Sequence, residues 1–473
     1  MKLAIYPPLG IARLGNSPDE FFIGPEEAGS PGVEIHTDGS EAAVTAFKDK
    51  NYRVKRQAAR FHLFEVFEDG RHPQPAVLPA GSVVTWKVSV ANKKDAIFRP
   101  AGPPDRPRSI HMDPGRADRL MHAVATVFSA SSPPVALDST YRGATVNLGH
   151  IRMDRSSRLI VTAASGRSAT LSNPPAPIGG DFYTNADWFD DVCDGSIAAT
   201  VVIAGNAPIE ADMAWLCTAP PDFSPATLGI VTLYDVLLEV AYKSGWQVAH
   251  TRPHFDTDLR PMIERAALHR FVSTNPVWAT ISMDWAQLAD AAPALRPLRT
   301  RVASLVREAE NAIQGFQLRD WQLDALDAWA EGEFELGARI DRGSCDVLTR
   351  TALDGTIGQS FFPGIEAGIN VVDPSIWLSN GFEFRLDSRL LEPGDMTAHM
   401  ALPWQADFLK CGAGWWPAQR PNDAPQGDGT FLPWLRPTMT HQGLVDGVMK
   451  LGVISANGDG TIVEQGRHPG LGS

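Results

Sequence analysis

Cysteine is scarce in this chain, with four residues among 473: Cys193, Cys217, Cys345 and Cys411. None lies in a CxxC pair, so their spacing does not favour a zinc site, and a disulfide framework is not expected in so large a chain. No run approaches the roughly 18 consecutive apolar residues of a membrane helix. The opening residues, "MKLAIYPPLG", are too short for a signal-peptide core. We therefore expect no membrane partner and a cytoplasmic location by default, with a non-standard export route left open.

Basic residues are outnumbered: 42 Lys and Arg stand against 55 Asp and Glu, which gives a net charge of −13. We expect no nucleic-acid partner, because phosphate binding needs a cationic face. A phosphate-binding glycine pattern is also lacking, since the isolated "GIARLG" does not make a dinucleotide fingerprint. No flavin or nicotinamide is therefore expected on this chain.

What the chain does have is length and a change of pattern along it. Its 473 residues favour two or three packed lobes, and its 44% hydrophobic content is ordinary for a globular protein. Up to about residue 205, runs such as "FHLFEVFEDG" and "GSVVTWKVSVAN" alternate, which predicts strands. From about residue 225, "TLYDVLLEVAYKSG", "RPMIERAALHRFV" and the span 285–336 carry apolar residues at three- and four-residue spacing, which predicts helices.

These patterns predict an α+β fold in two domains. A β-rich domain of layered sheets would span residues 1–205, and a mixed helical, loop-rich domain would span residues 206–473. Trp, Cys and Asp gather in the loops of the last third, and loops on a rigid scaffold are where chemistry usually lies. The second domain is therefore the expected catalytic domain.

The stretch "DFLKCGAGWWPAQRPND", residues 407–423, places a thiol close to two indoles. Asp407 and Cys411 would share one face of a helix. The glycines after Cys411 let the backbone double back toward Trp415 and Trp416. Two plainer alternatives stay open: a buried core cysteine beside tryptophan, or a nucleophilic cysteine helped by Asp407 and His399.

The segment "PGDMTAHMALPWQADFLKC", followed by "WWPAQRP", resembles the core of the lysine ε-oxidase and glycine oxidase family. Members of that family build a cysteine tryptophylquinone from their own side chains. The opening "IYPPLGIARLGNSPDEFFIGPE" and the strand-like "VKRQAARFHLFEVFEDG" and "WKVSVANKKDA" resemble the same family. So do "DWFDDVCDGSI", "TLYDVLLEVA", "SFFPGIEAG" and "LVDGVMKLGVI", in the family's order. The resemblance spans nearly the whole chain.

The resemblance implies a role for each residue of the motif. Cys411 matches the cysteine whose sulfur is bonded to the indole, and Trp416 matches the ring that is oxidised to the quinone. Trp415 would pack beside that ring. Asp407 matches the carboxylate implicated in cofactor formation and proton abstraction, and burial would favour that role by raising its pKa.

The activity implied by the resemblance is oxidative deamination of a primary amine, in an amino acid or a derivative, with the quinone as electron sink. The products would be an aldehyde or oxo acid, ammonia and hydrogen peroxide, with dioxygen as oxidant. A separate flavoprotein would install the cofactor, and homo-oligomers are expected. One alternative is a quinone-dependent tailoring enzyme that oxidises or hydroxylates an amino acid without releasing ammonia. Another is a non-catalytic scaffold that lacks the mature cofactor.

Several further residues are candidates for the substrate pocket beside Trp415. His399 and His441 lie near the motif, although a lone histidine is more often structural. Arg420 could hold a substrate carboxylate, or it could pair with Asp407 or Asp423.

The sequence departs from the family pattern at several positions. Four residues separate Cys411 from Trp416, fewer than in the established oxidases. Thr356 stands where relatives carry a cysteine, Phe189 replaces the usual tyrosine, and Ala418 stands where the lysine oxidase has a histidine. These changes remove polar groups around the expected substrate site, so the identity of the substrate stays open.

The segment "DWFDDVCDG" holds four aspartates, which could be read as a calcium loop: Asp187, Asp190, Asp191 and Asp194. Their positions do not follow the ligand spacing of an EF-hand. We expect them instead to cap turns and pair with arginine, and no metal is expected. Cys193, which lies among them, is expected to be a buried small residue.

Overall fold

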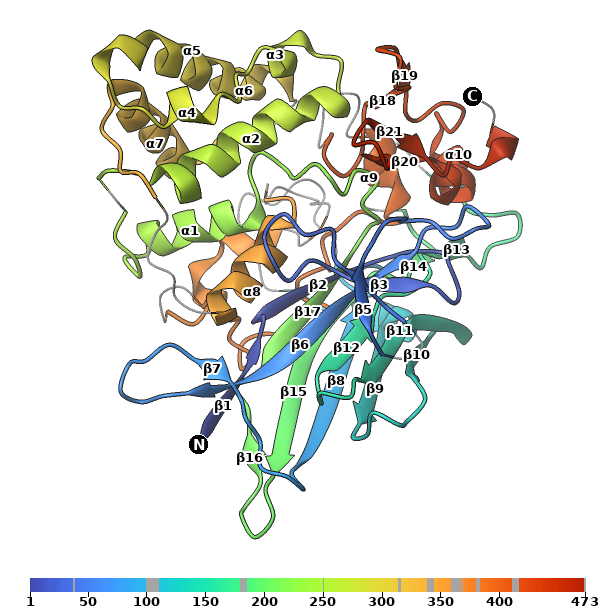
Figure 1. Cartoon of the computed structure of the whole chain (residues 1–473). Coiled ribbons are helices and arrows are strands. Elements are labelled where there is room, and N and C mark those ends of the chain that lie inside the picture. The colour runs from blue at the N-terminus through green and yellow to red at the C-terminus, as the bar shows by residue number, and fades with distance from the viewer. Residues whose placement is uncertain are drawn as a thin grey trace.

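A large curved sheet, a group of helices on one side of it and a C-terminal group of short elements make up the computed structural model (Figure 1). It describes residues 1–36, 39–98, 110–178, 185–249, 251–313, 316–337, 344–358, 366, 369–379, 383–410 and 417–471. No helix in this described part of the chain combines the length and the apolar character that crossing a membrane requires. The predicted α+β class, with a β-rich N-terminal region, is confirmed.

The described residues form a 15-stranded sheet whose main path holds nine strands. In chain order these nine are β2 (Leu9–Arg13), β6 (Arg56–Val66), β8 (Val83–Asn92), β9 (Met121–Val127), β10 (Val135–Tyr141), β11 (Ala144–Met153), β12 (Leu159–Thr162), β15 (Asp194–Val202) and β17 (Ala214–Ala219). Across the sheet their order is β10-β11-β12-β6-β2-β17-β15-β8-β9. The strands off this path are β1 (Lys2–Tyr6), β3 (Phe21–Ile23), β4 (Val33–Ile35), β5 (Glu41–Ala43), β7 (Gln74–Pro75) and β16 (Ile209–Glu210).

The alternating runs found in the sequence are strands of this sheet. "FHLFEVFEDG" lies largely in β6 and "GSVVTWKVSVAN" in β8, so both strand predictions are confirmed. In β8 the alternate residues Val84, Trp86, Val88 and Val90 are buried, as expected for a strand with one face on a core. The sheet continues through β17, so its strands lie on both sides of residue 205.

The sheet curls until its two ends meet. Strands β9 and β10 end the hydrogen-bonded path, yet they contact each other. The backbone N–H of His122 in β9 donates to the Oγ of Ser139 in β10 over 2.7 Å. The result is an almost closed barrel, which the natural twist of strands favours. Its interior is filled by large side chains, among them Phe61, Trp86, Tyr141 and Leu148.

Two parallel strands at the centre of the sheet are buried on both faces. Strand β2 pairs with β17 in parallel, and every residue of both strands is buried. Leu216 of β17 belongs to the barrel core, whereas Trp215 and Cys217 belong to a second core formed with the helices. Continuous apolar runs of this kind are typical of strands covered on both sides.

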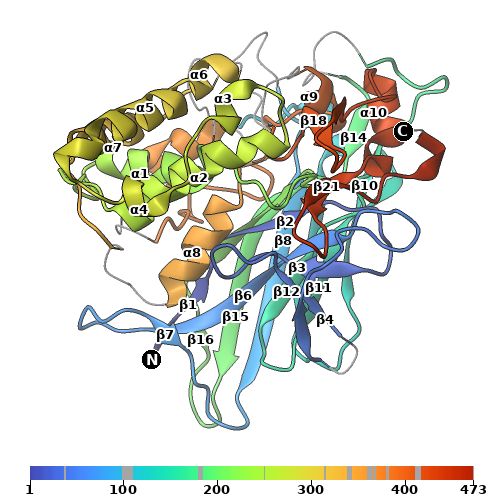
Figure 2. The same ribbon diagram turned by 45° about the horizontal axis from the view of Figure 1, so that its top comes forward.

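Helices cover this second face, and those within 232–245, 260–272 and 285–336 were predicted from their three- and four-residue spacing. The covering helices are α1 (Leu233–Lys243), α2 (Arg260–Leu268), α3 (Pro276–Ala279), α4 (Trp285–Leu288), α5 (Arg296–Arg307), α6 (Ala309–Ala312), α7 (Asp320–Glu331) and α8 (Ser344–Asp354). Helix α1 begins with a capping box between Thr232 and Asp235, as its sequence favours. Helix α8 lies between the other helices and the sheet and contacts both α1 and β2 (Figure 2).

The C-terminal elements pack on the barrel side. These are α9 (Gln405–Lys410), β18 (Asp423–Pro425), β19 (Phe431–Pro433), α10 (His441–Gly447), β20 (Val453–Ala456) and β21 (Ile462–Gln465). A two-stranded ribbon of β13 (Ser168–Thr170) and β14 (Trp188–Asp190) lies on the same side (Figure 1). Trp404, Phe408 and Trp434 belong to the same apolar cluster as the barrel interior. The region predicted to carry the chemistry is therefore built on the sheet.

Candidate active site

Helix α9 carries the carboxylate that the sequence places beside the predicted cofactor. Asp407 is 3% exposed, and its neighbours Ala406 and Phe408 are buried as well. The prediction that "DFLK" is helical is confirmed. The helix ends at Lys410, and the predicted cofactor residues Cys411 and Trp416, with Trp415, lie outside the described residues. What the structure gives is a carboxylate held out of bulk water on the helix that precedes Cys411 in the sequence.

The chain that returns after residue 416 is tied to α9. Arg420 is 3% exposed, and its Nε donates to the backbone carbonyl of Phe408 in α9. Its Nη1 donates to the Oδ1 of Asn422 over 3.1 Å. One guanidinium therefore joins the segment that leads into residues 411–416 to the segment that leaves them.

Asp423, one partner considered for Arg420, is engaged elsewhere. Its Oδ2 accepts hydrogen bonds from the backbone N–H of Thr274, over 2.8 Å, and from the Thr274 hydroxyl, over 2.9 Å. Arg420 thus directs two of its nitrogens at the chain near the motif. Its role toward a substrate carboxylate stays a prediction.

Both predicted histidines come from segments that adjoin α9. His399 is 7% exposed and lies in the segment that leads into the helix. His441 is the first residue of α10, whose N-cap Thr440 accepts a hydrogen bond from Gly443. Helix α10 packs against α9, so the segments that carry both histidines adjoin the helix that carries Asp407. Contact of either histidine with a substrate stays a prediction.

Thr356 lies at the end of α8, beside an ion pair that the sequence analysis did not single out. Its hydroxyl donates to the Ala352 carbonyl over 3.0 Å. The Nη2 of Arg13 donates to the Gly355 carbonyl over 2.6 Å, and Glu366 accepts from the Ile357 N–H over 2.7 Å. Both residues next to Thr356 are therefore held in place.

Arg13 and Glu366 also contact each other, and both side chains are almost fully buried. Burial by itself lowers the pKa of Arg13, but the facing Glu366 carboxylate raises it, and the net shift is upward. The guanidinium therefore keeps its charge.

Phe189 is part of the barrel core. It lies in β14 and its ring centroid is 4.7 Å from that of Tyr141. The guanidinium of Arg167 is 5.5 Å from the same ring. These contacts account for an aromatic residue at this position, and lining of a substrate pocket by Phe189 stays a prediction.

The four aspartates of "DWFDDVCDG" fall into two groups. Asp187 is only partly buried, and it pairs with Arg119 and Arg142 at 3.2 and 3.1 Å, as expected. The other three are buried. Asp190 contacts Lys94 at 2.8 Å, and Asp194 accepts from the N–H and the hydroxyl of Thr397 over 2.8 and 2.6 Å. The expectation of arginine partners is thus wrong for Asp190, whose partner is a lysine far away in sequence.

Burial shapes the titration of two of these carboxyls. It raises the pKa of Asp194 to about 6 and that of Asp191 to about 7. The Oδ2 of Asp191 accepts from the Arg167 N–H over 2.8 Å, whereas its Oδ1 has no hydrogen-bond partner among the described residues. Cys193, which lies between them, is buried as expected.

The residues that sequence reasoning missed are Lys94, Arg13 and Glu366. Local spacing gave no sign of them, because each partner is about a hundred or more positions away. One signal was present: "ANKKDA" places two lysines directly after the buried strand β8, where a lysine needs a partner.

Comparison with known proteins finds two family models. Residues 6–218 match the model described as L-Lysine epsilon oxidase N-terminal, and residues 303–427 match the L-lysine epsilon oxidase C-terminal domain. Among curated proteins, the L-lysine 6-oxidase of Marinomonas mediterranea is 25% identical over 527 aligned residues, which cover 87% of this chain and 71% of that protein.

Solved structures resemble the fold along nearly its whole length. The crystal structure of the L-Lys epsilon-oxidase from Marinomonas mediterranea aligns with a TM-score of 0.79 and 19% identity, over 98% of this chain and 95% of that chain. The crystal structure described as the Schiff base intermediate of the same enzyme with L-Lys aligns equally well, with a TM-score of 0.79. At this level of identity the likeness shows a shared fold.

Proposed function

Because this chain belongs to the L-lysine ε-oxidase family, on the match of both family models, we propose that it is an amino-acid oxidase that acts on a primary amine. The cofactor of this proposal is a cysteine tryptophylquinone formed from Cys411 and Trp416. The reaction converts amine, dioxygen and water into an aldehyde or oxo acid, ammonia and hydrogen peroxide. The relatives' substrate, L-lysine, is not carried over to this chain.

The observation that supports the cofactor most directly is the tie between Arg420 and α9. A bond between two side chains five positions apart requires the chain to turn back on itself. Since Arg420 donates to the Phe408 carbonyl, the segments on either side of residues 411–416 already meet. The residue types fit too, because a thiol and an indole are the two groups that this cofactor needs. The quinone would supply a carbonyl for the amine and an acceptor for two electrons.

The residues around that position have roles that their burial and origin support. Asp407, 3% exposed on α9, would take the proton from the carbon that carries the amine. His399 and His441 would line the pocket from the two adjoining segments. Thr356, Phe189 and Ala418 would leave its wall less polar than in relatives, so we propose an amino acid or derivative other than lysine or glycine as substrate.

The proposal includes partners besides the amine and dioxygen. A separate flavoprotein would introduce the two oxygens and the thioether, because this chain carries no dinucleotide fingerprint of its own. A homo-oligomer and a cytoplasmic location remain parts of the proposal.

Intact mass tests the proposal directly. Protein made together with the maturation flavoprotein of its own source should be heavier than the plain chain by about 28 Da, the sum of two oxygens gained and four hydrogens lost. Cys411→Ala should lack both this shift and the visible absorbance of the quinone. An unshifted wild-type mass under these conditions would show that the cofactor does not form.

A panel of amino acids should then give ammonia and hydrogen peroxide in equal amounts with the true substrate. Peroxide without ammonia would point to a tailoring oxidation instead.

A further inference from the structure

The barrel core contains a lysine whose charge is fully shielded from water. The side chains of Lys94 and Asp190 are each 0% exposed, and Nζ lies 2.8 Å from Oδ2. Removing two charges from water is costly, so a buried pair is weak evidence for stability. The pair does fix the position of the groups around it, because each buried charge needs further hydrogen-bond partners close by.

Those remaining bonds converge on the segment that leads into α9. The Nζ of Lys94 also donates to the carbonyl of Ala401 over 2.9 Å. The Oδ2 of Asp190 also accepts from the N–H of Trp404 over 3.0 Å. Between them, Asn185 donates through Nδ2 to the carbonyl of Leu402 over 2.8 Å. Three backbone groups within four consecutive residues are therefore held by buried side chains of the barrel region.

Helix α9 begins at the next residue and is itself held by the same region. The indole N–H of Trp404 donates to the Gly166 carbonyl over 3.2 Å, and its ring meets Phe408 edge-on at 5.5 Å. Gln405 accepts from the hydroxyl of Ser168 over 2.7 Å. A helix of six residues is too short to be stable alone. Its direction therefore depends on where residues 401–405 are fixed.

From this geometry we propose that the Lys94–Asp190 ion pair positions α9 and thereby aims the Asp407 carboxylate. Lys94 and Asp190 are positioning residues, since they act through the backbone of Ala401 and Trp404. The proposal rests on the proposed function, in which Asp407 takes a proton from the substrate.

The first test uses the unmatured chain and needs no cofactor. Hydrogen exchange is measured by mass spectrometry on peptides from 398–409 in wild type and Lys94→Met. The variant should exchange faster there by about tenfold, because the Ala401 carbonyl loses its donor and Asp190, which accepts from the Trp404 N–H, loses its ion-pair partner. The matched control is Arg60→Met, which removes a buried cation of β6 from its ion pairs with Glu26 and Glu41. Arg60→Met should leave the exchange rate of peptides 398–409 at its wild-type value. A wild-type exchange rate in Lys94→Met would overturn the proposal.

The second test separates positioning from stability. In Lys94→Met, kcat per mole of quinone should fall by about a hundredfold with little change in KM, as expected for a displaced proton acceptor. The double variant Lys94→Met/Asp190→Leu leaves no unpaired buried charge, so its Tm should recover relative to the single variant. Its kcat should stay low. If kcat recovers together with Tm, the pair is merely structural.

The outcome is distinguishable from failure of the proposed function. If wild type carries no quinone, the proposed function fails, yet the hydrogen-exchange result still decides whether the ion pair fixes α9. If wild type carries the quinone and both variants keep full kcat, the positioning proposal alone fails.

Discussion

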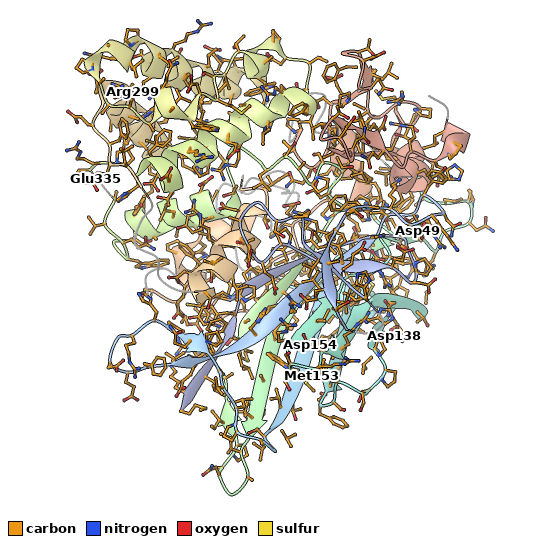
Figure 3. All side chains as sticks on the ribbon, viewed as in Figure 1. Asp49, Asp138, Met153, Asp154, Arg299 and Glu335 are labelled. Atoms are coloured by element: carbon orange, nitrogen blue, oxygen red, sulfur yellow. The ribbon has the colours of Figure 1, made fainter. Side chains whose placement is uncertain are left out.

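The helical region and the barrel region use their buried charges differently. In the helical region, Arg299 lies on α5 (Figure 3). It is 0% exposed and donates to the carbonyls of Trp329 and Asp290, over 2.9 and 2.6 Å, within the same region. In the barrel region, the buried Asp190 and Asp194 reach residues 396–404 of the C-terminal segment. The hydrogen bonds of Arg299 stabilise the packing of the helices on one another. Those of Asp190 and Asp194 fix a segment that is distant in sequence. The helices therefore cover the central strands, while the barrel region holds the segment that leads into the proposed site.

The largest expected effect falls on the segment that the barrel fixes. We expect Asp407→Ala to block either maturation or turnover, because it removes the proposed proton acceptor from α9. Quinone content is read from visible absorbance and mass, and turnover from peroxide release. Wild-type values for both in this variant would eliminate Asp407 from the site.

A substitution of the same severity in the helical region should behave differently. Trp329 is 0% exposed in α7, and its indole N–H donates to the Leu288 carbonyl over 3.0 Å. Trp329→Ala should lower the free energy of unfolding by about 3–5 kcal/mol. Measured below its Tm, kcat per mole of quinone should stay within about threefold of wild type. A larger fall in kcat would contradict the proposed difference between the two regions, since the helices would then also help to orient the site.

The smallest expected effect is a change in the pH dependence of stability. Burial raises the pKa of Asp191 to about 7, above its value of about 3.9 in an unfolded chain. Between about pH 4 and pH 7 the folded state therefore binds more protons than the unfolded state, so the free energy of unfolding falls as pH rises, by at most about 1.4 kcal/mol per pH unit.

Asp191→Asn removes this dependence, so the variant should gain stability relative to wild type as pH rises through that window. Urea unfolding at several pH values measures it, with Asp256→Asn at an exposed position as control. Parallel curves for wild type and Asp191→Asn would show that this carboxyl is ionised in the folded state.

Much of the fold was predictable because its signals are local. Alternation gave β6 and β8, and three- and four-residue spacing gave α1, α2, α5 and α7. The parallel pairing of β2 with β17 was not predictable, because "LGIAR" and "AWLCTA" carry no mark of each other. Nor was the meeting of β9 with β10, which depends on the accumulated twist of the whole sheet.

In the candidate site, too, local features were predictable from the sequence and long-range contacts were not. The placement of Asp407 on a helix followed from the spacing of "DFLKC". The hold of Lys94 and Asp190 on residues 401–404 could not be found in this way, because it joins three parts of the chain through tertiary structure. Burial of a lysine is likewise a property of the packed molecule, which a composition cannot reveal.

The parallel pairing of β2 with β17 has a consequence for folding during synthesis on the ribosome. Residues 9–13 pair with residues 215–219, so about 200 further residues must be synthesised before this pairing can form. Until then the early strands present unpaired edges, which are prone to association with other chains. The nascent chain is therefore prone to aggregation until β17 has been synthesised and can pair with β2.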